Sequence, residues 1–252
     1  MLEIRGIRKS FGAQTVLDGL DLVLPPGQVT ALLARNGAGK STLIGLIAGR
    51  LIADGGSIRF NGAALSVASG GARPVEVLRR IGVAPQDTGV YPDLNVIENV
   101  TFAGGCYGLR GRRLRIAAER ALERLGLENT TTKKARDLSG GQKRRLHTAM
   151  ALVHEPELLL LDEPTVGSDP EARRYILAAV RDLAGQGATV LYTSHYFPEI
   201  EALRADVAIL HSGRILTHGP FERVTGGDMS GKNLEDIFLL MTENRELSGV
   251  GS

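Results

Sequence analysis

The segment 34–41 constrains the fold more than any other part of the chain. Its sequence is Ala-Arg-Asn-Gly-Ala-Gly-Lys-Ser, and it connects an apolar run, residues 29–33, to a segment of helical periodicity, residues 41–48. Glycines let such a loop curl until its backbone N–H groups point at one anion, and a helix N-terminus adds to the attraction. Lys40 can reach the β- and γ-phosphates of a nucleotide, and the Ser41 hydroxyl can bind Mg²⁺. The segment therefore predicts a phosphate-binding turn between a buried strand and a helix.

Ala34 stands at the first position of this loop, where the consensus has glycine. The effect of its methyl group depends on the backbone angle φ at that position. A positive φ would cost an alanine about 1 kcal/mol or more, whereas a negative φ would cost nothing. The sequence leaves both cases open.

Strand and helix patterns alternate along most of the chain. Alternating or continuously apolar runs predict strands at residues 2–4, 20–24, 29–33, 57–60, 158–161, 189–193 and 207–210. Residues 96–153 have mainly helical character, and one amphipathic helix there has an apolar face of Leu114, Ala117, Ala118, Ala121, Leu122 and Leu125. This alternation predicts an α/β fold with a largely parallel sheet.

The composition excludes several classes of protein. With 43% apolar and 23% charged residues, the chain has the balance of a soluble globular protein with a sizeable core. A net charge of +2 is too small to indicate nucleic acid or an anionic membrane. The single cysteine, Cys106, cannot form an intrachain disulfide, which favours a reducing compartment. We expect no secretory signal in the first nine residues, and no apolar run approaches the ~20 residues of a membrane-spanning helix.

Two acidic residues follow the apolar run at residues 158–161. Asp162 and Glu163 would lie at the carboxyl end of a buried strand, beside the phosphate loop. There Asp162 is expected to hold Mg²⁺, and Glu163 is placed to orient or deprotonate an attacking water. The alternative, a strand end with solvated acids, does not explain the phosphate loop upstream.

A second glycine-containing segment, residues 138–142, has the sequence Leu-Ser-Gly-Gly-Gln and precedes a helix. Serine followed by two glycines at a helix start can bind an anion or simply cap the helix. His195 follows the strand predicted at residues 189–193, and position alone distinguishes it from the other histidines. The other histidines, His147, His154, His211 and His218, have no acids or cysteines nearby at metal-ligand spacing.

Three of these segments occur in the order and at the spacing of the motifs of ABC ATPases. Residues 34–41 resemble the Walker A motif, residues 138–142 the signature motif, and residues 158–163 the Walker B motif. The resemblance extends from about Leu2 to Pro220, nearly the whole chain.

Single residues match further positions of the family. Gln86 resembles the Q-loop glutamine, which contacts Mg²⁺ and couples to the membrane subunit. Asp169 resembles the D-loop aspartate, although Ser168 stands where leucine is commoner. His195 resembles the switch histidine that contacts the γ-phosphate, and Phe11 resembles the aromatic residue that stacks on adenine.

The resemblance thus assigns roles to a defined set of residues. It implies catalytic roles for Glu163, His195 and Gln86, and Mg²⁺ binding by Ser41, Gln86 and Asp162. The residues expected to contact the nucleotide are Phe11, Val16, Asn36, Gly37, Ala38, Gly39, Lys40, Ser41, Thr42, Ser139, Gly140, Gly141, Gln142 and Asp169.

The resemblance also implies a fold and a domain organisation. The fold is an α/β P-loop NTPase with a RecA-like parallel core, an antiparallel β subdomain and an inserted helical subdomain at about residues 88–155. An ATPase domain would cover residues 1–222, followed by a short C-terminal helix and tail at 223–252.

The cofactors implied are ATP and Mg²⁺. In this family two subunits face head to tail, and ATP lies between the Walker A loop of one and the signature motif of the other. The partners implied are a second copy or a related ATPase subunit, and a separate transmembrane permease subunit. The permease would hold the chain at the cytoplasmic face of the cell membrane. No nucleic acid partner is expected, because the basic clusters at 110–113 and 143–145 are interpreted as solvated helix faces.

Two segments are similar to daunorubicin-type drug-export ATPases, namely residues 192–196 and a helix predicted at residues 233–242. They favour a bacterial exporter. A non-transport ABC ATPase acting on DNA or ribosomes is an alternative, although the chain has no coiled-coil insertion, zinc cysteines or second cassette. A P-loop kinase or GTPase would leave residues 138–142 unexplained. A catalytically weak, regulatory nucleotide-binding subunit remains open because of Ala34.

Overall fold

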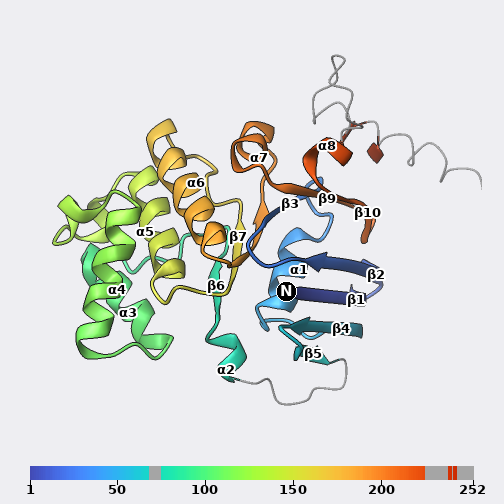
Figure 1. The fold of residues 1–252 in the computed structure, drawn as a ribbon, viewed down its shortest axis with the longest axis horizontal. Coiled ribbons are helices and arrows are strands. Elements are labelled where there is room, and N and C mark those ends of the chain that lie inside the picture. The colour runs from blue at the N-terminus through green and yellow to red at the C-terminus, as the bar shows by residue number, and fades with distance from the viewer. Residues whose placement is uncertain (68–74, 225–237, 240, 243–252) are drawn as a thin grey trace, which may run out of the picture.

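In the computed structural model, which describes residues 1–67, 75–224, 238–239 and 241–242, a six-stranded sheet forms the centre of the fold (Figure 1). Its strand order is β10-β9-β3-β8-β7-β6, and all neighbours are parallel except β9 and β10. The strands are β3 (Val29–Leu33), β6 (Ile81–Ala84), β7 (Leu158–Asp162), β8 (Thr189–Thr193), β9 (Asp206–His211) and β10 (Arg214–Gly219). β3, β7 and β8 are buried along their whole length, which explains their continuously apolar sequences.

A second, antiparallel sheet covers one side of this core. Its strand order is β2-β1-β4-β5. The strands are β1 (Leu2–Phe11), β2 (Gln14–Leu24), β4 (Gly55–Phe60) and β5 (Ala63–Val67). Helix α1 (Lys40–Ile47) shares one apolar cluster with both sheets, so its residues Leu43 and Ile44 are fully buried. The phosphate loop is therefore fixed at both ends, by β3 before it and by α1 after it.

Three longer helices form a group on the far side of the parallel sheet from the antiparallel sheet, drawn in green to yellow in Figure 1. They are α3 (Val96–Cys106), α4 (Gly111–Arg124) and α5 (Gly140–Leu152), with short 3₁₀ turns at Glu128–Thr130 and Ala135–Asp137. The α4 residues Ala118, Ala121 and Leu122 are buried, as the apolar face of the sequence predicts. The helical region is confirmed, while the domain boundaries at 88, 155 and 222 stay predictions.

The remaining helices are α2 (Val75–Leu78), α6 (Pro170–Gly185), α7 (Phe197–Leu203) and α8 (Phe221–Val224). Helices α5, α6 and α7 cover the face of the parallel sheet opposite α1, and their apolar residues form the second apolar cluster with that face. The C-terminal helix predicted at 233–242 falls largely outside the described residues. Among the helices that the structure describes, none combines the length and apolar character needed to cross a membrane.

Candidate nucleotide site

The phosphate loop turns sharply between β3 and α1. Gly37 and Gly39 have φ values of 79° and 106°, which L-residues with a side chain rarely adopt. A Cβ at Gly39 would also lie 2.9 Å from Leu17 Cδ2. The glycine at this position is therefore required both by backbone angle and by close packing against β2.

Ala34 departs from the consensus without backbone strain. The non-glycine residues of the described chain with positive φ are Asn61, Glu155, Glu163, Arg204 and Ser212, and Ala34 is not one of them. Its side chain is 6% exposed and packs in the apolar cluster around α1. Its carbonyl oxygen accepts a hydrogen bond from Lys40 Nζ at 3.0 Å. The structure thus resolves the question that the sequence left open, because an alanine fits this position.

We expect Ala34→Gly to change the kcat and KM for ATP hydrolysis by less than about twofold. The Ala34 methyl group packs in the apolar cluster and does not line the nucleotide pocket. A glycine at an ordinary φ lowers the free energy of unfolding by only about 0.5–1 kcal/mol, because it increases the conformational entropy of the unfolded chain. Steady-state kinetics and thermal unfolding of the two proteins measure both quantities. A rise in kcat of tenfold or more would contradict this expectation and show that Ala34 restrains turnover.

The two predicted carboxylates lie where β7 ends. The Asp162 side chain is oriented by Thr193 of the neighbouring strand β8, whose hydroxyl donates to Asp162 Oδ1 at 2.7 Å. Thr193 also accepts from the Glu163 backbone N–H, at 2.9 Å through Oγ1 and 3.2 Å through its carbonyl oxygen. These bonds hold Glu163 in the left-handed region, at φ 49°, which costs a residue with a side chain about 1 kcal/mol or more. Sequence reasoning missed Thr193, whose only signal was its place at the end of β8.

Three side chains from three separate segments converge on the Glu163 carboxylate, which is itself buried. Lys40 Nζ lies 3.7 Å from Glu163 Oε1, and His195 Nδ1 lies 3.6 Å from the same oxygen. Gln86 Nε2 donates to Glu163 Oε2 at 3.3 Å. The carboxyl ends of parallel strands thus bring together groups that are far apart in the sequence.

A pocket of about 400 Å³ opens above these groups. It is lined by Phe11, Val16, Asn36, Gly37, Gly39, Lys40, Ser41, Thr42, Gln86, Glu163 and His195, all of which the sequence predicts as site residues. Phe11 is half exposed at the rim, and Lys9 Nζ lies 5.3 Å from its ring centroid. The pocket combines an exposed aromatic ring, a phosphate loop with its lysine, and a carboxylate next to a histidine. Asp162 lies outside this lining, and so does Ala38.

The predicted signature residues and Asp169 also lie outside the lining of this pocket. Ser139 caps α5: its Oγ accepts from Gln142 N at 3.2 Å, and Gln142 Oε1 accepts from Ser139 N at 3.1 Å. A Cβ at Gly141 would collide with the carboxylate of Asp169, which caps α6 by accepting from Ala172 N at 2.7 Å. The signature motif and Asp169 thus form one unit that is separate from the pocket of the same chain.

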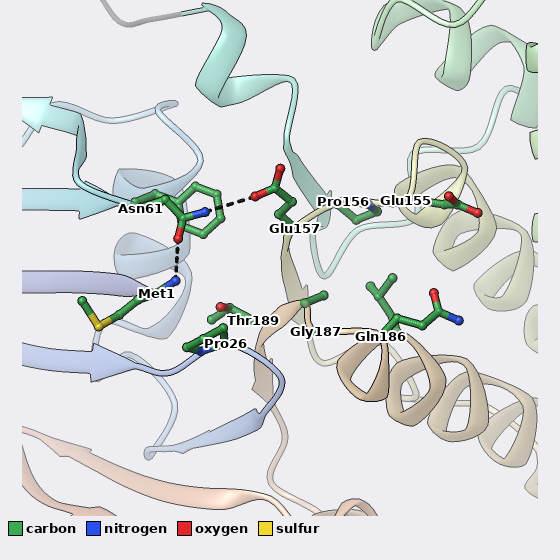
Figure 2. Close-up of a pocket in the computed structure, with 12 residues that line it drawn as sticks. Met1, Pro26, Asn61, Glu155, Pro156, Glu157, Gln186, Gly187 and Thr189 are labelled. Carbon is green, nitrogen blue, oxygen red and sulfur yellow. Dashed lines mark hydrogen bonds between the residues drawn. The ribbon is translucent and has the colours of Figure 1, made fainter.

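A second pocket, of about 280 Å³, lies at the opposite, amino-terminal edge of β7 and β8 (Figure 2). Figure 2 shows the Asn61 side chain between the Met1 amino group, at 2.6 Å, and Glu157 Oε2, at 3.1 Å. The lining contains two glutamates and one cation, the Met1 amino group, so its net charge is negative. Its charge is therefore unsuited to phosphate, and the nucleotide site lies at the other edge of the sheet.

Two histidines near the helices are neutral at physiological pH. Burial lowers the pKa of His147 to about 4, with a smaller effect from the Arg144 charge. Burial likewise lowers the pKa of His154 to about 4. Among the described residues, no group of three or more histidines, cysteines or acids could hold a metal ion.

The fold and the pocket define a nucleotide-binding protein of the P-loop class. The family model for ABC transporters matches residues 17–166. The chain is 39% identical over 219 residues to the linearmycin resistance ATP-binding protein of Bacillus subtilis, covering 87% of this chain and 69% of that protein. It is 37% identical to the Nod factor export ATP-binding protein I of Cupriavidus metallidurans, covering 87% and 71%. It is also 37% identical to a daunorubicin resistance ATP-binding protein of Streptomyces coeruleorubidus, covering 90% and 71%.

Solved structures agree with these relatives. The structure described as the ATP-binding subunit of an ABC transporter superposes with a TM-score of 0.84 at 28% identity, over 96% of this chain and 99% of that one. A nucleotide-free ATP-binding cassette from an ABC transporter superposes with a TM-score of 0.79 at 26% identity, over 94% and 98%. The chain therefore belongs to the ABC transporter family, as an ATP-binding subunit with the P-loop NTPase fold. Membership of this family makes it a transport-coupled ATPase.

Proposed function

We propose that the chain is the motor subunit of a bacterial exporter and that it hydrolyses ATP in the 400 Å³ pocket. The observation that carries this proposal is the convergence of Lys40, Gln86 and His195 on the buried carboxylate of Glu163. The relatives are named as resistance and export proteins, which supports export. The comparisons give no support to a role on DNA or ribosomes.

The phosphates would lie along residues 36–42, where backbone N–H groups, the start of α1 and the Lys40 ammonium meet. Phe11 at the rim would stack on the adenine ring, and Val16 in the same lining would add an apolar contact. Phosphoryl transfer depends mainly on positioning and on neutralising charge. These residues supply both.

Ser41, Gln86 and Asp162 suit Mg²⁺ because hydroxyl, amide and carboxylate oxygens are the ligands that this ion prefers. Ser41 and Gln86 line the pocket, and Thr193 orients the carboxylate of Asp162 behind it. When bound, the ion would supply positive charge to the phosphate oxygens. Glu163 would accept a proton from the attacking water, and His195 would hydrogen-bond to the γ-phosphate.

The signature motif completes the site from a second chain. Ser139 to Gln142 and Asp169 form a separate unit at the starts of α5 and α6 and do not line the pocket of their own chain, which supports a role toward another chain. Two copies, or one copy and a related ATPase subunit, would close head to tail around ATP. Hydrolysis would then release the two halves and move a transmembrane permease, which holds the subunit at the cytoplasmic face of the membrane.

We expect the chain to copurify with a multi-helix membrane protein when the two are coexpressed from neighbouring genes. In inverted membrane vesicles the pair should accumulate a small hydrophobic compound, a lipid or a polysaccharide, and only when ATP is supplied. Vesicles in which the chain carries Glu163→Gln serve as the control. Stable copurification with DNA or ribosomes and with no membrane protein would contradict the proposal.

A further inference from the structure

A fully buried carboxylate lies behind the nucleotide pocket. Glu199, on α7, is 1% exposed and accepts three hydrogen bonds. Thr165 Oγ1 donates to Oε1 at 2.7 Å, while Tyr192 OH and Ser194 Oγ donate to Oε2 at 2.8 and 2.9 Å. Arg173 forms an ion pair with it, with Nε 3.0 Å from Oε1. A buried charge is costly unless it is paired and hydrogen-bonded, and Glu199 satisfies both conditions.

The partners of Glu199 come from the segments that carry the catalytic groups. Thr165 follows Glu163 by two residues in the turn after β7, and Ser194 directly precedes His195 at the end of β8. One carboxylate therefore joins the segment of the general base to the segment of the switch histidine.

Arg173 adds a third segment. It lies in the first turn of α6, whose N-cap is Asp169. Its guanidinium carbon is 4.5 Å from the ring centroid of Tyr196, on the other side of His195. The Tyr196 backbone N–H in turn donates to Ser194 Oγ at 3.0 Å. His195 is thus flanked by Ser194, which hydrogen-bonds to Glu199, and by Tyr196, which contacts the Arg173 ion-paired with Glu199.

The network requires an acceptor with a negative charge. Burial raises the pKa of Tyr192 well above its ordinary value, and the Glu199 charge raises it further, so Tyr192 remains a neutral donor. Thr165, Ser194 and Tyr192 all donate to the two oxygens of Glu199. A glutamine would have the same shape, but it would present an NH₂ group in place of one acceptor and leave Arg173 without its counter-ion.

We propose that Glu199 is a positioning residue, which holds the His195 segment and the Glu163 turn in register for ATP hydrolysis. The inference rests on the proposed function of Glu163 and His195. Glu199 is not among the described residues that line the nucleotide pocket. Its loss should therefore lower the rate of the chemical step and leave nucleotide affinity unchanged.

Glu199→Gln is expected to lower kcat by about tenfold or more, because a small misplacement of catalytic groups costs up to about 100-fold. The Kd for a non-hydrolysable ATP analogue should stay within about twofold, since the phosphate loop is unaltered. The matched control is Glu201→Gln, an exposed position two residues further along the same helix, which should behave like wild type. A kcat for Glu199→Gln within twofold of wild type would overturn the inference.

Two milder variants keep the inference testable if Glu199→Gln does not fold. Ser194→Ala and Thr165→Val each remove one donor and leave the Glu199–Arg173 ion pair in place. Each should lower kcat severalfold at unchanged Kd, whereas unchanged kcat in both would overturn the inference.

A double-variant cycle separates positioning from general destabilisation. If Glu199 acts through His195, the combined loss of kcat in His195→Ala/Glu199→Gln should be clearly smaller than the product of the two single losses. A loss of kcat in the double variant equal to the product of the two single losses would show that His195 and Glu199 act independently, and it would overturn the inference. Wild-type protein without ATPase activity would instead overturn the proposed function itself, so the two failures are distinguishable.

Discussion

Glu163→Gln is expected to lower the kcat of ATP hydrolysis by about 100-fold or more, while ATP still binds. A general base contributes about 10²–10⁴-fold to such a reaction, and an amide cannot accept the proton. The substitution keeps the size of the side chain, and the phosphate loop retains its backbone N–H groups and the Lys40 ammonium for binding ATP. Phosphate release and the Kd for ATP measure the two quantities separately.

The chain contains a well-matched control for this substitution. Glu155 also has a positive φ, 51° compared with 49° at Glu163, but it is exposed at the opposite edge of the sheet (Figure 2). Glu155→Gln makes the same chemical change on the same kind of backbone and should leave kcat unaltered. If Glu163→Gln hydrolyses ATP at a near-normal rate, Glu163 is not the general base.

Ser139→Arg is expected to leave ATP binding to the single chain intact and to weaken the ATP-bound dimer by about tenfold or more. Ser139 is exposed and lies outside the pocket of its own chain. The larger side chain would be forced into the closing interface, and overpacking of this kind costs about 1–3 kcal/mol. Because the proposed mechanism places each ATP between two chains, kcat at a fixed protein concentration should fall by a similar factor.

The dimer can be measured directly in a background that does not hydrolyse ATP. With ATP, Glu163→Gln should elute as a dimer on gel filtration, and Glu163→Gln/Ser139→Arg as a monomer. Ser139→Thr is the control, since threonine retains a hydroxyl that can cap α5, as Ser139 does for Gln142 N. An undiminished ATPase rate in Ser139→Arg would show that the signature motif does not complete the site of a second chain.

Local patterns in the sequence predicted the parts of the fold that depend on local physics. The apolar runs became β3, β7 and β8, and the amphipathic pattern in residues 114–125 became α4. Strand β6 was missed because it is short and contains Gly82, which is usually unfavourable in strands. In the structure this glycine is required by packing, since a Cβ there would collide with the Ala151 carbonyl oxygen at the end of α5. Such a contact cannot be inferred from neighbouring residues.

In the candidate site too, some residues could be recognised from local sequence and others only from tertiary contacts. Its motifs could be recognised in the sequence because phosphate loops, strand-end carboxylates and helix caps depend on residues that are adjacent in the chain. The roles of Thr193 and Glu199 could not be recognised, since each depends on a partner that is distant in sequence, Asp162 and Thr165 respectively. Thr193 meets Asp162 only because β7 and β8 are neighbours in the sheet. Glu199 meets Thr165 only because α7 packs beside the turn after β7.

The phosphate loop shows both kinds of information in one segment. Its glycines, Lys40 and Ser41 were sufficient to predict what binds there, because the chemistry of phosphate recognition is carried by consecutive residues. Whether Ala34 impairs the loop depended on a backbone angle and on the packing around α1. Both are consequences of how β3, α1 and the two sheets are placed against one another, and only the tertiary structure decides that placement.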